Sequence, residues 1–557
     1  MRRQSSSAGN NGGPGRKVIH LHIGFQKTGS TAIQAGLLQS ADRFGQDGII
    51  VPFFEIGPGM VQVTKTNFGP AFVSAFGEPR AGTPVSAQWG SEPQDFEEAR
   101  SHMLAAVETA IGAGERIVIS GEGIATLPTT GLMRLRSWFD SRGWSLDVVA
   151  VVRPPLDFVT SMTQLRINTH RGDVGEPVFV SQSARILMLM AVFGDEISFV
   201  PFAELTAHER GPFGWFLEWL KVSDPADFDL PTVVNPSISN EAARILQFIN
   251  GHEPRLLGRV LFPEARADRP IEGDRLNPRR SASDAGPLSL LPGRKFFLSL
   301  EERLRMNDQL IAENALMADV LGEGFANDSV EPISLVSEAD EEFTEYGDEH
   351  FDYLRLALTC LDSRLFDLTA EYFENSPMVS ADARERAAGL FSEVAPWRAV
   401  CLTGPVTVDR TRTLALEVEA DDLPLAYLLM SAAYCSRPFG IYIERRRRLF
   451  ERKLFGQPLK LPRGVHEFGS ASLDRMETLA QRSAVDDGDF NVAAFLMAHV
   501  CAARPTDANQ RRLADYTAPL HLPPDLGSDA AGEVRSVDVT SGIRDRLRNA
   551  EELNNPQ

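Results

Sequence analysis

Residues 17–38 read KVIHLHIGFQKTGSTAIQAGLL, and this stretch decides the fold of the first half of the chain. It begins with a short apolar, β-prone run that breaks at Gly24. It then resumes in a helical pattern, because Ile33, Leu37 and Leu38 recur at helix spacing. The stretch therefore predicts a strand, a glycine-bounded turn and a helix in direct succession.

The turn between the predicted strand and helix has the composition of an anion site. Glycine lets the backbone pass close to a ligand, and the free N–H groups and positive dipole end of the next helix then face that ligand. Lys27 adds a mobile full charge, and Ser30 and Thr31 add hydroxyl donors. The turn thus predicts a phosphate site, although many glycine turns of this kind serve only to reverse the chain.

The position of the lysine separates this loop from the usual nucleotide-triphosphatase loop. That loop, G-x-x-x-x-G-K-[ST], has its lysine after the second glycine, whereas Lys27 precedes Gly29. The order K-T-G-S-T after a strand resembles the 5′-phosphosulfate loop of sulfotransferases that use 3′-phosphoadenosine 5′-phosphosulfate (PAPS). The resemblance implies that Lys27 neutralises charge on the leaving phosphate, and that this phosphate is held by Thr28, Gly29, Ser30 and Thr31.

A second motif follows another predicted strand. Residues 144–152, WSLDVVAVV, form a continuous apolar run that is typical of a buried parallel strand. Arg153 follows it, and Ser161 lies eight residues further on in a predicted helix. The 3′-phosphate site of the sulfotransferases is similar, and a guanidinium group can donate two parallel hydrogen bonds to phosphate. The alternative is an arginine that caps a strand and a serine on an ordinary helix. The two motifs together, in the right order on the right elements, favour the phosphate site.

A third candidate residue ends the strand predicted at residues 116–120. In open parallel sheets, ligand-handling residues lie just past the carboxyl ends of strands, so Glu122 is expected to face the same crevice as Lys27. The resemblance implies a role for it, since a glutamate near such a strand end is the base on the acceptor hydroxyl in several carbohydrate sulfotransferases. Alternatively, Glu122 stabilises the N-terminus of the following helix.

The resemblance covers residues 17–325, where strands and helices alternate. The pattern predicts an α/β fold, a P-loop-like doubly wound parallel sheet with helices on both faces. Residues 57–93 are read as a long surface excursion that either shapes the acceptor pocket or is a disordered insert. The resemblance implies that Arg279, Arg280, Arg294 and Lys295 could reach the adenosine 3′-phosphate, as a basic loop does in some relatives, but most arginines in such loops are solvated. Further strands are expected at 48–54 and 197–201, and helices at 95–111, 129–142, 183–193, 212–220, 241–250 and 299–321.

At 557 residues the chain is long enough for two or more domains. Beyond the α/β part, a dense acidic run at 331–350 reads as a linker, and helices dominate afterwards. The expected organisation is a flexible tail (1–16), a sulfotransferase-like domain (17–330), the linker (331–350), a helical domain (351–525) and a polar tail (526–557).

The helical half contains an internal sequence repeat. AYLLMSAAYCSRP at 426–438 resembles AAFLMAHVCAARP at 493–505, at an offset of 67 residues. This offset is close to two 34-residue tetratricopeptide-like hairpins, although a plain helical bundle is equally compatible. Residues 445–448 and Lys453 form a basic helix face, read as solvated or, alternatively, as a docking surface for an anionic protein partner.

Composition limits the functions that remain. The formal net charge of −20 argues against nucleic-acid binding. No apolar run is long enough to cross a bilayer, and the N-terminus lacks the apolar segment of a secretory signal. The four cysteines have no metal-ligand spacing and read as free thiols in a reducing compartment. A cytoplasmic enzyme is therefore expected.

The resemblance implies transfer of a sulfuryl group from PAPS to an acceptor hydroxyl, with a glycan as the expected acceptor and Lys27 and Glu122 as the catalytic residues. No metal is expected, because a lysine can balance the smaller charge of the sulfuryl group. Two alternatives remain at this point: a kinase or other nucleoside triphosphatase on the same fold, and a non-catalytic nucleotide-binding protein.

Overall fold

The structure is a computed structural model of the whole chain. It describes residues 17–52, 66–77, 96–112, 114–169, 179–231, 237–252, 286–327, 344–361, 363–402, 405–437, 441–459, 462 and 468–521. The two predicted tails lie outside these residues, as do most of the 57–93 excursion and residues 253–285.

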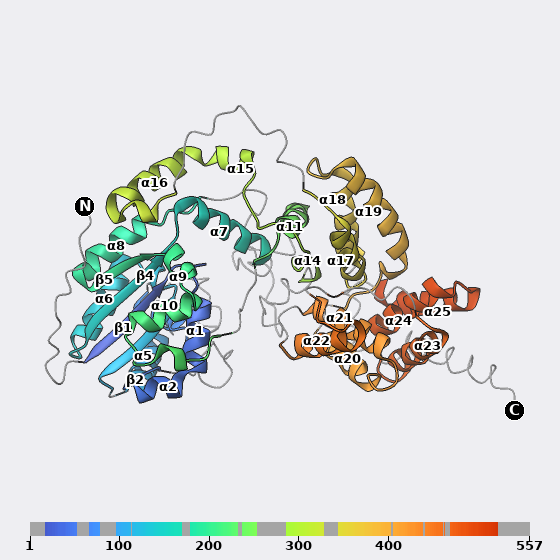
Figure 1. Cartoon of the computed structure of the whole chain (residues 1–557), viewed down its shortest axis with the longest axis horizontal. Helices are drawn as coiled ribbons and strands as arrows, with labels where there is room; N and C mark the ends of the chain where they lie inside the picture. Colours follow the sequence, from blue (N-terminus) through green and yellow to red (C-terminus); the bar gives the residue numbers. More distant parts are fainter. Residues whose placement is uncertain are drawn as a thin grey trace.

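A parallel five-stranded sheet forms the centre of the first half (Figure 1). Its order is β2-β3-β1-β4-β5, so β1 lies between strands that come from later in the chain. At the carboxyl edge Gly24 is level with Glu122 of β3 and Val151 of β4. This edge therefore brings the ends of three strands together. The strands are β1 (Val18–Gly24), β2 (Ile49–Ile50), β3 (Arg116–Glu122), β4 (Ser145–Val152) and β5 (Ile197–Pro201).

Helices cover both faces of the sheet, because alternate strand residues are apolar on each side. One face packs against α3 (Gly69–Phe76), α5 (Phe96–Ile111), α6 (Thr129–Asp140), α8 (Ser183–Phe193) and α16 (Asn307–Leu321). The other packs against α1 (Ser30–Gln39), α2 (Ala41–Gln46), α9 (Phe202–Ala207) and α10 (Gly211–Trp219). The predicted α/β sheet followed by a helical half is confirmed at this level.

Two local predictions differ from the structure. Residues 66–77, within the predicted excursion, pack on the sheet: Asn67 pairs with Ser120 of β3, and the almost wholly apolar helix α3 follows. The helix expected at 299–321 is two helices that meet at Met306. Ser299 begins the first, α15 (Leu300–Arg305), through a reciprocal capping box with Glu302.

The helical half shares a hydrophobic core with helices of the first half. In α7 (Pro155–Thr169), α11 (Asn240–His252) and α14 (Gly286–Ser289), buried side chains join the core of α17 (Asp348–Leu358), α18 (Ser363–Asn375) and α19 (Ala381–Val394). Figure 1 shows α11 and α14 between the sheet and the later helices.

The predicted acidic linker is shorter at its C-terminal end than expected. Thr344 pairs with Val379, Tyr346 is only 5% exposed, and α17 already begins at Asp348. The buried aromatic side chain of Tyr346, whose hydroxyl pairs with that of Tyr372, anchors this end, which the charge count alone did not reveal. Residues 328–343 lie outside the described part.

The internal sequence repeat (residues 426–438 and 493–505) corresponds to two successive three-helix groups. The first comprises α20 (Pro405–Glu417), α21 (Leu423–Ser436) and α22 (Ile441–Phe455), and the second α23 (Ser470–Val485), α24 (Phe490–Ala503) and α25 (Asp507–Thr517). The two central helices, α21 and α24, begin at equivalent aspartate caps, Asp422 and Asp489. Three described helices therefore occupy each 67-residue period, unlike two 34-residue hairpins.

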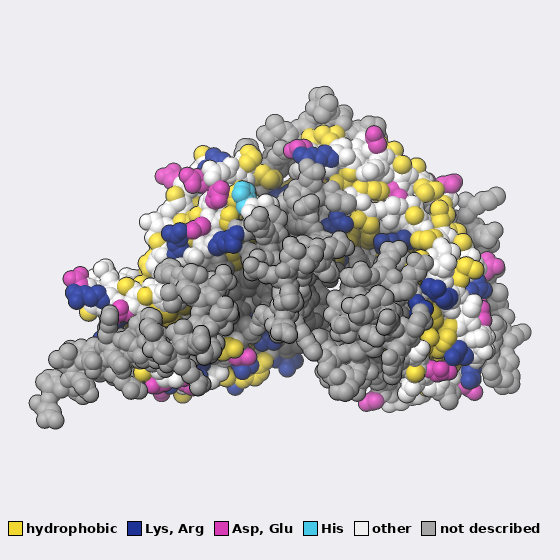
Figure 2. Space-filling view, turned by 180° about the vertical axis from the view of Figure 1, so that it is seen from behind, with side chains coloured by type: hydrophobic (Ala, Val, Ile, Leu, Met, Phe, Trp, Pro, Cys, Tyr) yellow, Lys and Arg dark blue, Asp and Glu magenta, His cyan; other side chains and the backbone are white. Residues whose placement is uncertain are grey.

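On the face that Figure 2 presents, the described side chains show charges of both signs interspersed, with no single basic patch among them. The basic helix of residues 445–448 also differs from its prediction. Arg447 is fully buried, paired with buried Glu451 and stacked on Tyr434. Glu419 forms ion pairs with both Arg446 and Lys453. Glu444 pairs with Arg448, so four of the five basic side chains of this face have a carboxylate partner.

No helix in the described part of the chain combines the length and the apolar character needed to cross a membrane. None of the four cysteines, all of which lie in described parts of the chain, forms a disulfide; Cys401 is partly buried and the other three are buried.

Candidate functional site

A cavity of about 1210 Å³ opens at the carboxyl edge of the sheet. Seven of the eight predicted site residues line it, although they come from three segments of the chain. These are Lys27, Gly29, Ser30, Thr31, Glu122, Arg153 and Ser161. The eighth, Thr28, is fully buried and its hydroxyl donates a 2.6 Å hydrogen bond to the carbonyl oxygen of Phe25. Its side chain closes the turn, so only its backbone could serve a ligand.

The backbone of the loop is left-handed at two positions. Gly29 has φ 84°, which glycine adopts without strain, but Lys27 has φ 65°. A lysine in this region is uncommon and costs conformational energy. The loop keeps this geometry while presenting the Lys27 side chain to the cavity.

Gly24 allows the loop to fold back over the end of β1. A Cβ atom at this position would lie 2.3 Å from Ser30 Oγ and 3.1 Å from Glu122 Cγ. The absence of a side chain therefore lets Ser30 and Glu122 approach each other. Ser30 Oγ is buried and makes no hydrogen bond of ordinary geometry, and its polar neighbour is the Glu122 carboxyl group. A buried hydroxyl without a hydrogen bond of ordinary geometry is costly unless a ligand satisfies it.

Glu122 is held by a residue that the sequence did not reveal. The side-chain oxygen of Asn67 accepts hydrogen bonds from the backbone N–H groups of Glu122, at 3.2 Å, and Gly69, at 3.0 Å. Burial raises the pKa of the Glu122 carboxyl group, and the nearby Ser30 hydroxyl and Lys27 ammonium partly oppose this rise. A carboxylate with a raised pKa is a stronger base than an ordinary one.

The three charged side chains of the site influence one another. Burial lowers the pKa of Lys27, the positive charge of Arg153 lowers it further, and Glu122 acts in the opposite direction. Two cations that repel each other across a partly buried cavity favour an anion between them. The three side chains together carry a net positive charge, and an anionic ligand between the two cations would reduce their repulsion.

Arg153 is positioned by its neighbours on both sides. Its guanidinium group stacks on Phe202, 3.7 Å from the ring centre, and the Gln182 side chain donates to its carbonyl oxygen at 2.9 Å. Burial lowers the pKa of Arg153 to about 10, so the group stays charged at neutral pH. Its Nε atom is buried without a hydrogen-bond partner. Arg153 is therefore fixed in orientation and retains a free donor.

Ser161 lies on α7, which begins just after Arg153. It shares the cavity-facing side of this helix with Asp157, Thr160 and Gln164. The Thr160 hydroxyl donates back to the Leu156 carbonyl, and the Gln164 amide donates to the Ile238 carbonyl at 2.7 Å. The helix register thus brings Ser161 to the cavity.

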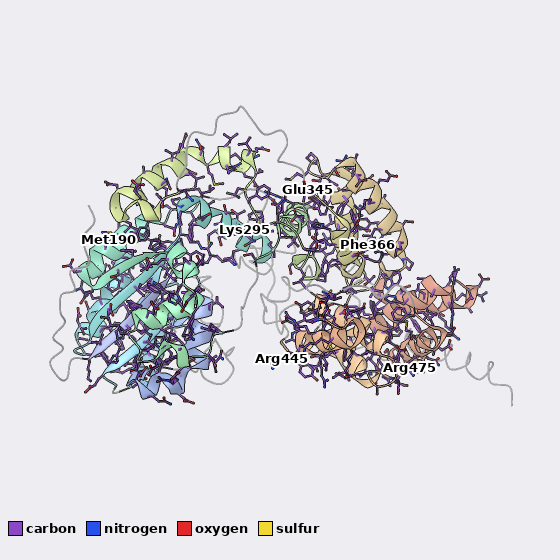
Figure 3. All side chains as sticks on the ribbon, viewed as in Figure 1. Met190, Lys295, Glu345, Phe366, Arg445 and Arg475 are labelled. Carbon is purple, nitrogen blue, oxygen red and sulfur yellow. The ribbon has the colours of Figure 1, made fainter. Side chains whose placement is uncertain are left out.

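Several lining residues come from residues 295–303, of which the sequence reasoning singled out only Lys295. Lys295 is exposed and lines the cavity, and Figure 3 shows it between α7 and α11. Arg303 also lines it, with a buried Nε atom that has no partner. Arg294, in contrast, turns to Glu241, to which its backbone N–H donates at 2.9 Å. The run RKFF at 294–297 was a signal, since it combines charge with aromatic rings after a polar loop.

The charge of the described lining is strongly positive for so acidic a chain. Five basic residues line the cavity against two acidic ones, Glu122 and Asp157. The basic residues are Lys27, Arg153, Arg210, Lys295 and Arg303. Arg210 is engaged with the carbonyl oxygens of Pro225 and Phe228, so the others carry the free donors. Within the described ranges, no group of three or more His, Cys, Asp or Glu side chains could hold a metal ion.

The chain matches no family model, no curated protein and no solved structure in the comparisons made.

Proposed function

We propose that this protein is a sulfotransferase that takes the sulfuryl group of PAPS and transfers it to an acceptor hydroxyl, with a glycan as the expected acceptor. One observation carries the proposal. Four residues of the K-T-G-S-T loop and the Arg153–Ser161 pair line one cavity, in which Arg153 Nε is buried without a partner and Ser30 Oγ lies beside the Glu122 carboxyl group. Each motif resembles the site for a different phosphate of the same nucleotide.

The residues present fit a nucleotide with two separate phosphates. Backbone N–H groups at the start of α1, the Ser30 and Thr31 hydroxyls and Lys27 suit the 5′-phosphosulfate. Arg153 and Ser161, at the end of β4 and on α7, suit the 3′-phosphate. A nucleoside triphosphate lacks a 3′-phosphate and would leave the second group of donors unused.

In the proposed reaction the acceptor oxygen forms a bond to sulfur while the bond between sulfur and the 5′-phosphate oxygen breaks. The electron pair of that bond leaves with the phosphate, so 3′-phosphoadenosine 5′-phosphate (PAP) is the second product. Lys27 stabilises the negative charge that builds up on the leaving oxygen. Glu122 receives the proton of the acceptor hydroxyl. The raised pKa of Glu122 suits it to this step.

The proposal is tested with PAPS that carries radiolabelled sulfur and a panel of glycan acceptors. We expect label to appear in at least one acceptor, and we expect EDTA to leave the rate unchanged because Lys27 supplies the charge that Mg²⁺ supplies in kinases. Lys27→Ala should abolish transfer. Lys221→Ala is the matched control, because Lys221 also has a positive φ, 53°, but does not line the cavity.

Two results would overturn the assignment. Transfer of phosphate from ATP with strict dependence on Mg²⁺ would favour the kinase alternative. Tight binding of PAPS without turnover on any acceptor would favour a non-catalytic nucleotide-binding protein.

A further inference from the structure

A second cavity, of about 280 Å³, lies within the helical half. It shares no lining residue with the cavity at the sheet edge. Its walls come from α17, α19, α21, α24 and the short helix Ala395–Trp397. The cavity therefore lies where the first helices of this half meet the central helices of the two repeated groups.

Two nitrogen atoms in the wall of this cavity are buried without partners. Trp397 is only 5% exposed, and its Nε1 atom has no acceptor. Nε2 of His499, on α24, is also buried and unpaired. An indole N–H can only donate, so it requires an acceptor oxygen. Leaving such groups unpaired costs free energy, which a ligand with a suitable polar group would recover.

The internal repeat shows that packing alone does not require a histidine here. His499 of α24 corresponds, at the offset of 67 residues, to Ala432 of α21, which is fully buried. The second group therefore carries a polar ring where the first has a methyl group. The rings of Trp397 and Phe495 hold His499 in place, at 4.7 Å and 4.9 Å between ring centres.

The charge and shape of the cavity define its ligand. Burial lowers the pKa of His499 to about 3, so this ring is neutral at ordinary pH. At the rim Arg355 and Glu393 form a two-pronged ion pair, at 2.8 Å and 2.9 Å, and cancel each other's charge. Trp397, Phe468 and Leu428 supply apolar wall. A charged ligand would lose hydration without gaining a counter-ion.

From these features we infer that the helical half contains a binding site for one neutral saccharide ring. A sugar hydroxyl can accept from Trp397 Nε1–H and can pair with His499 Nε2 in either tautomer. The C–H face of the ring fits the aromatic wall, and further hydroxyls can reach the charged pair at the rim. The volume is near the lower limit of about 300 Å³ for ligand pockets, so a single ring fits better than an oligosaccharide.

The experiment uses the full chain without any nucleotide, so its outcome is independent of sulfuryl transfer. Ligand-detected NMR is recorded with methyl glucoside, methyl galactoside, methyl mannoside and N-acetylglucosamine. We expect at least one of these sugars to bind. Trp397→Phe and His499→Phe, which keep an aromatic ring but remove the nitrogens, should each weaken binding about tenfold. Trp138→Phe is the matched control, because Trp138 lies on α6 and outside the cavity.

Thermal melting identifies any variant that fails to fold. In that case an NMR measurement on the wild-type chain still tests the inference. The Trp397 indole N–H signal of the wild type, identified as the one that Trp397→Phe lacks or by assignment, should shift when the sugar is added. The inference is overturned if no sugar of the panel binds the wild type, or if binding is unchanged in both folded variants. It is also overturned if phenol or indole shifts the Trp397 signal while every sugar leaves it unmoved.

Discussion

At the scale of single residues, Glu122 depends most strongly on its surroundings. Asn67 fixes its backbone, Gly24 leaves room for its side chain, and burial raises its pKa. Its side chain faces a cavity that also contains Lys27. These features suit a base that acts beside a cation.

We predict that Glu122→Gln retains donor binding but lowers turnover by about 10²–10⁴-fold, because glutamine cannot accept the proton. Calorimetry with PAP and the rate of label transfer measure the two effects separately. Normal turnover in the variant would assign the base to another group. Loss of PAP binding together with turnover would indicate a structural role instead.

Comparing the pH dependence of the rate and stability of the wild type with those of Glu122→Gln tests the direction of the Glu122 pKa shift. A base must be deprotonated, so the wild-type rate should rise with pH through a pKa above the ordinary 4.5. The raised pKa also means that the folded state favours the protonated form, so Glu122 should lower stability as the pH rises through this value. The glutamine variant should lack both effects, which rate profiles and melting curves recorded against pH can check.

At the scale of elements, the turn from β1 to α1 depends on the close approach of the Ser30 side chain to Gly24. Gly24→Ala would bring a methyl group to 2.3 Å from Ser30 Oγ, so the serine hydroxyl must leave its present position. The lost hydrogen bond to a charged phosphate should weaken PAP binding by roughly tenfold or more. Gly45→Ala, on α2, is the control, because its new Cβ would meet no atom within 4 Å. Equal PAP affinity in the two variants would contradict this role for Gly24.

Local patterns predicted these elements well, and contacts distant in sequence account for what was missed. The loop at 24–31 and the Arg153–Ser161 spacing could be recognised because each lies within one strand–helix unit. Asn67 and Phe202 reach the site through pairings between separate segments, for which no periodic signal exists. Arg447 was read as solvated because its partner, Glu451, only becomes buried with it when the helices pack.

At the scale of the whole molecule, the two halves are joined by a common core. Helices α7 and α11 contribute buried residues to the core of the helical half, and α7 also carries Ser161 of the candidate site. The sequence predicted the order of the two halves, but the apolar faces that join them could not be assigned to partners without the fold. The first cavity is rich in free cationic donors, while the second is neutral and aromatic.

The central claim is that Arg153 recognises a 3′-phosphate, which separates PAP from other adenine nucleotides. It is tested most directly by measuring by calorimetry the affinities of PAP and adenosine 5′-monophosphate for the wild type and Arg153→Ala. Arg166→Ala is the control, since this arginine lies on the same helix as Ser161 but outside the cavity.

A charge-assisted phosphate contact contributes about 1.5–3 kcal/mol, so the wild type and the control should prefer PAP by about 10-fold to 150-fold. Arg153→Ala should bind the two nucleotides equally. The same preference in Arg153→Ala, or no preference in the wild type, would contradict the account.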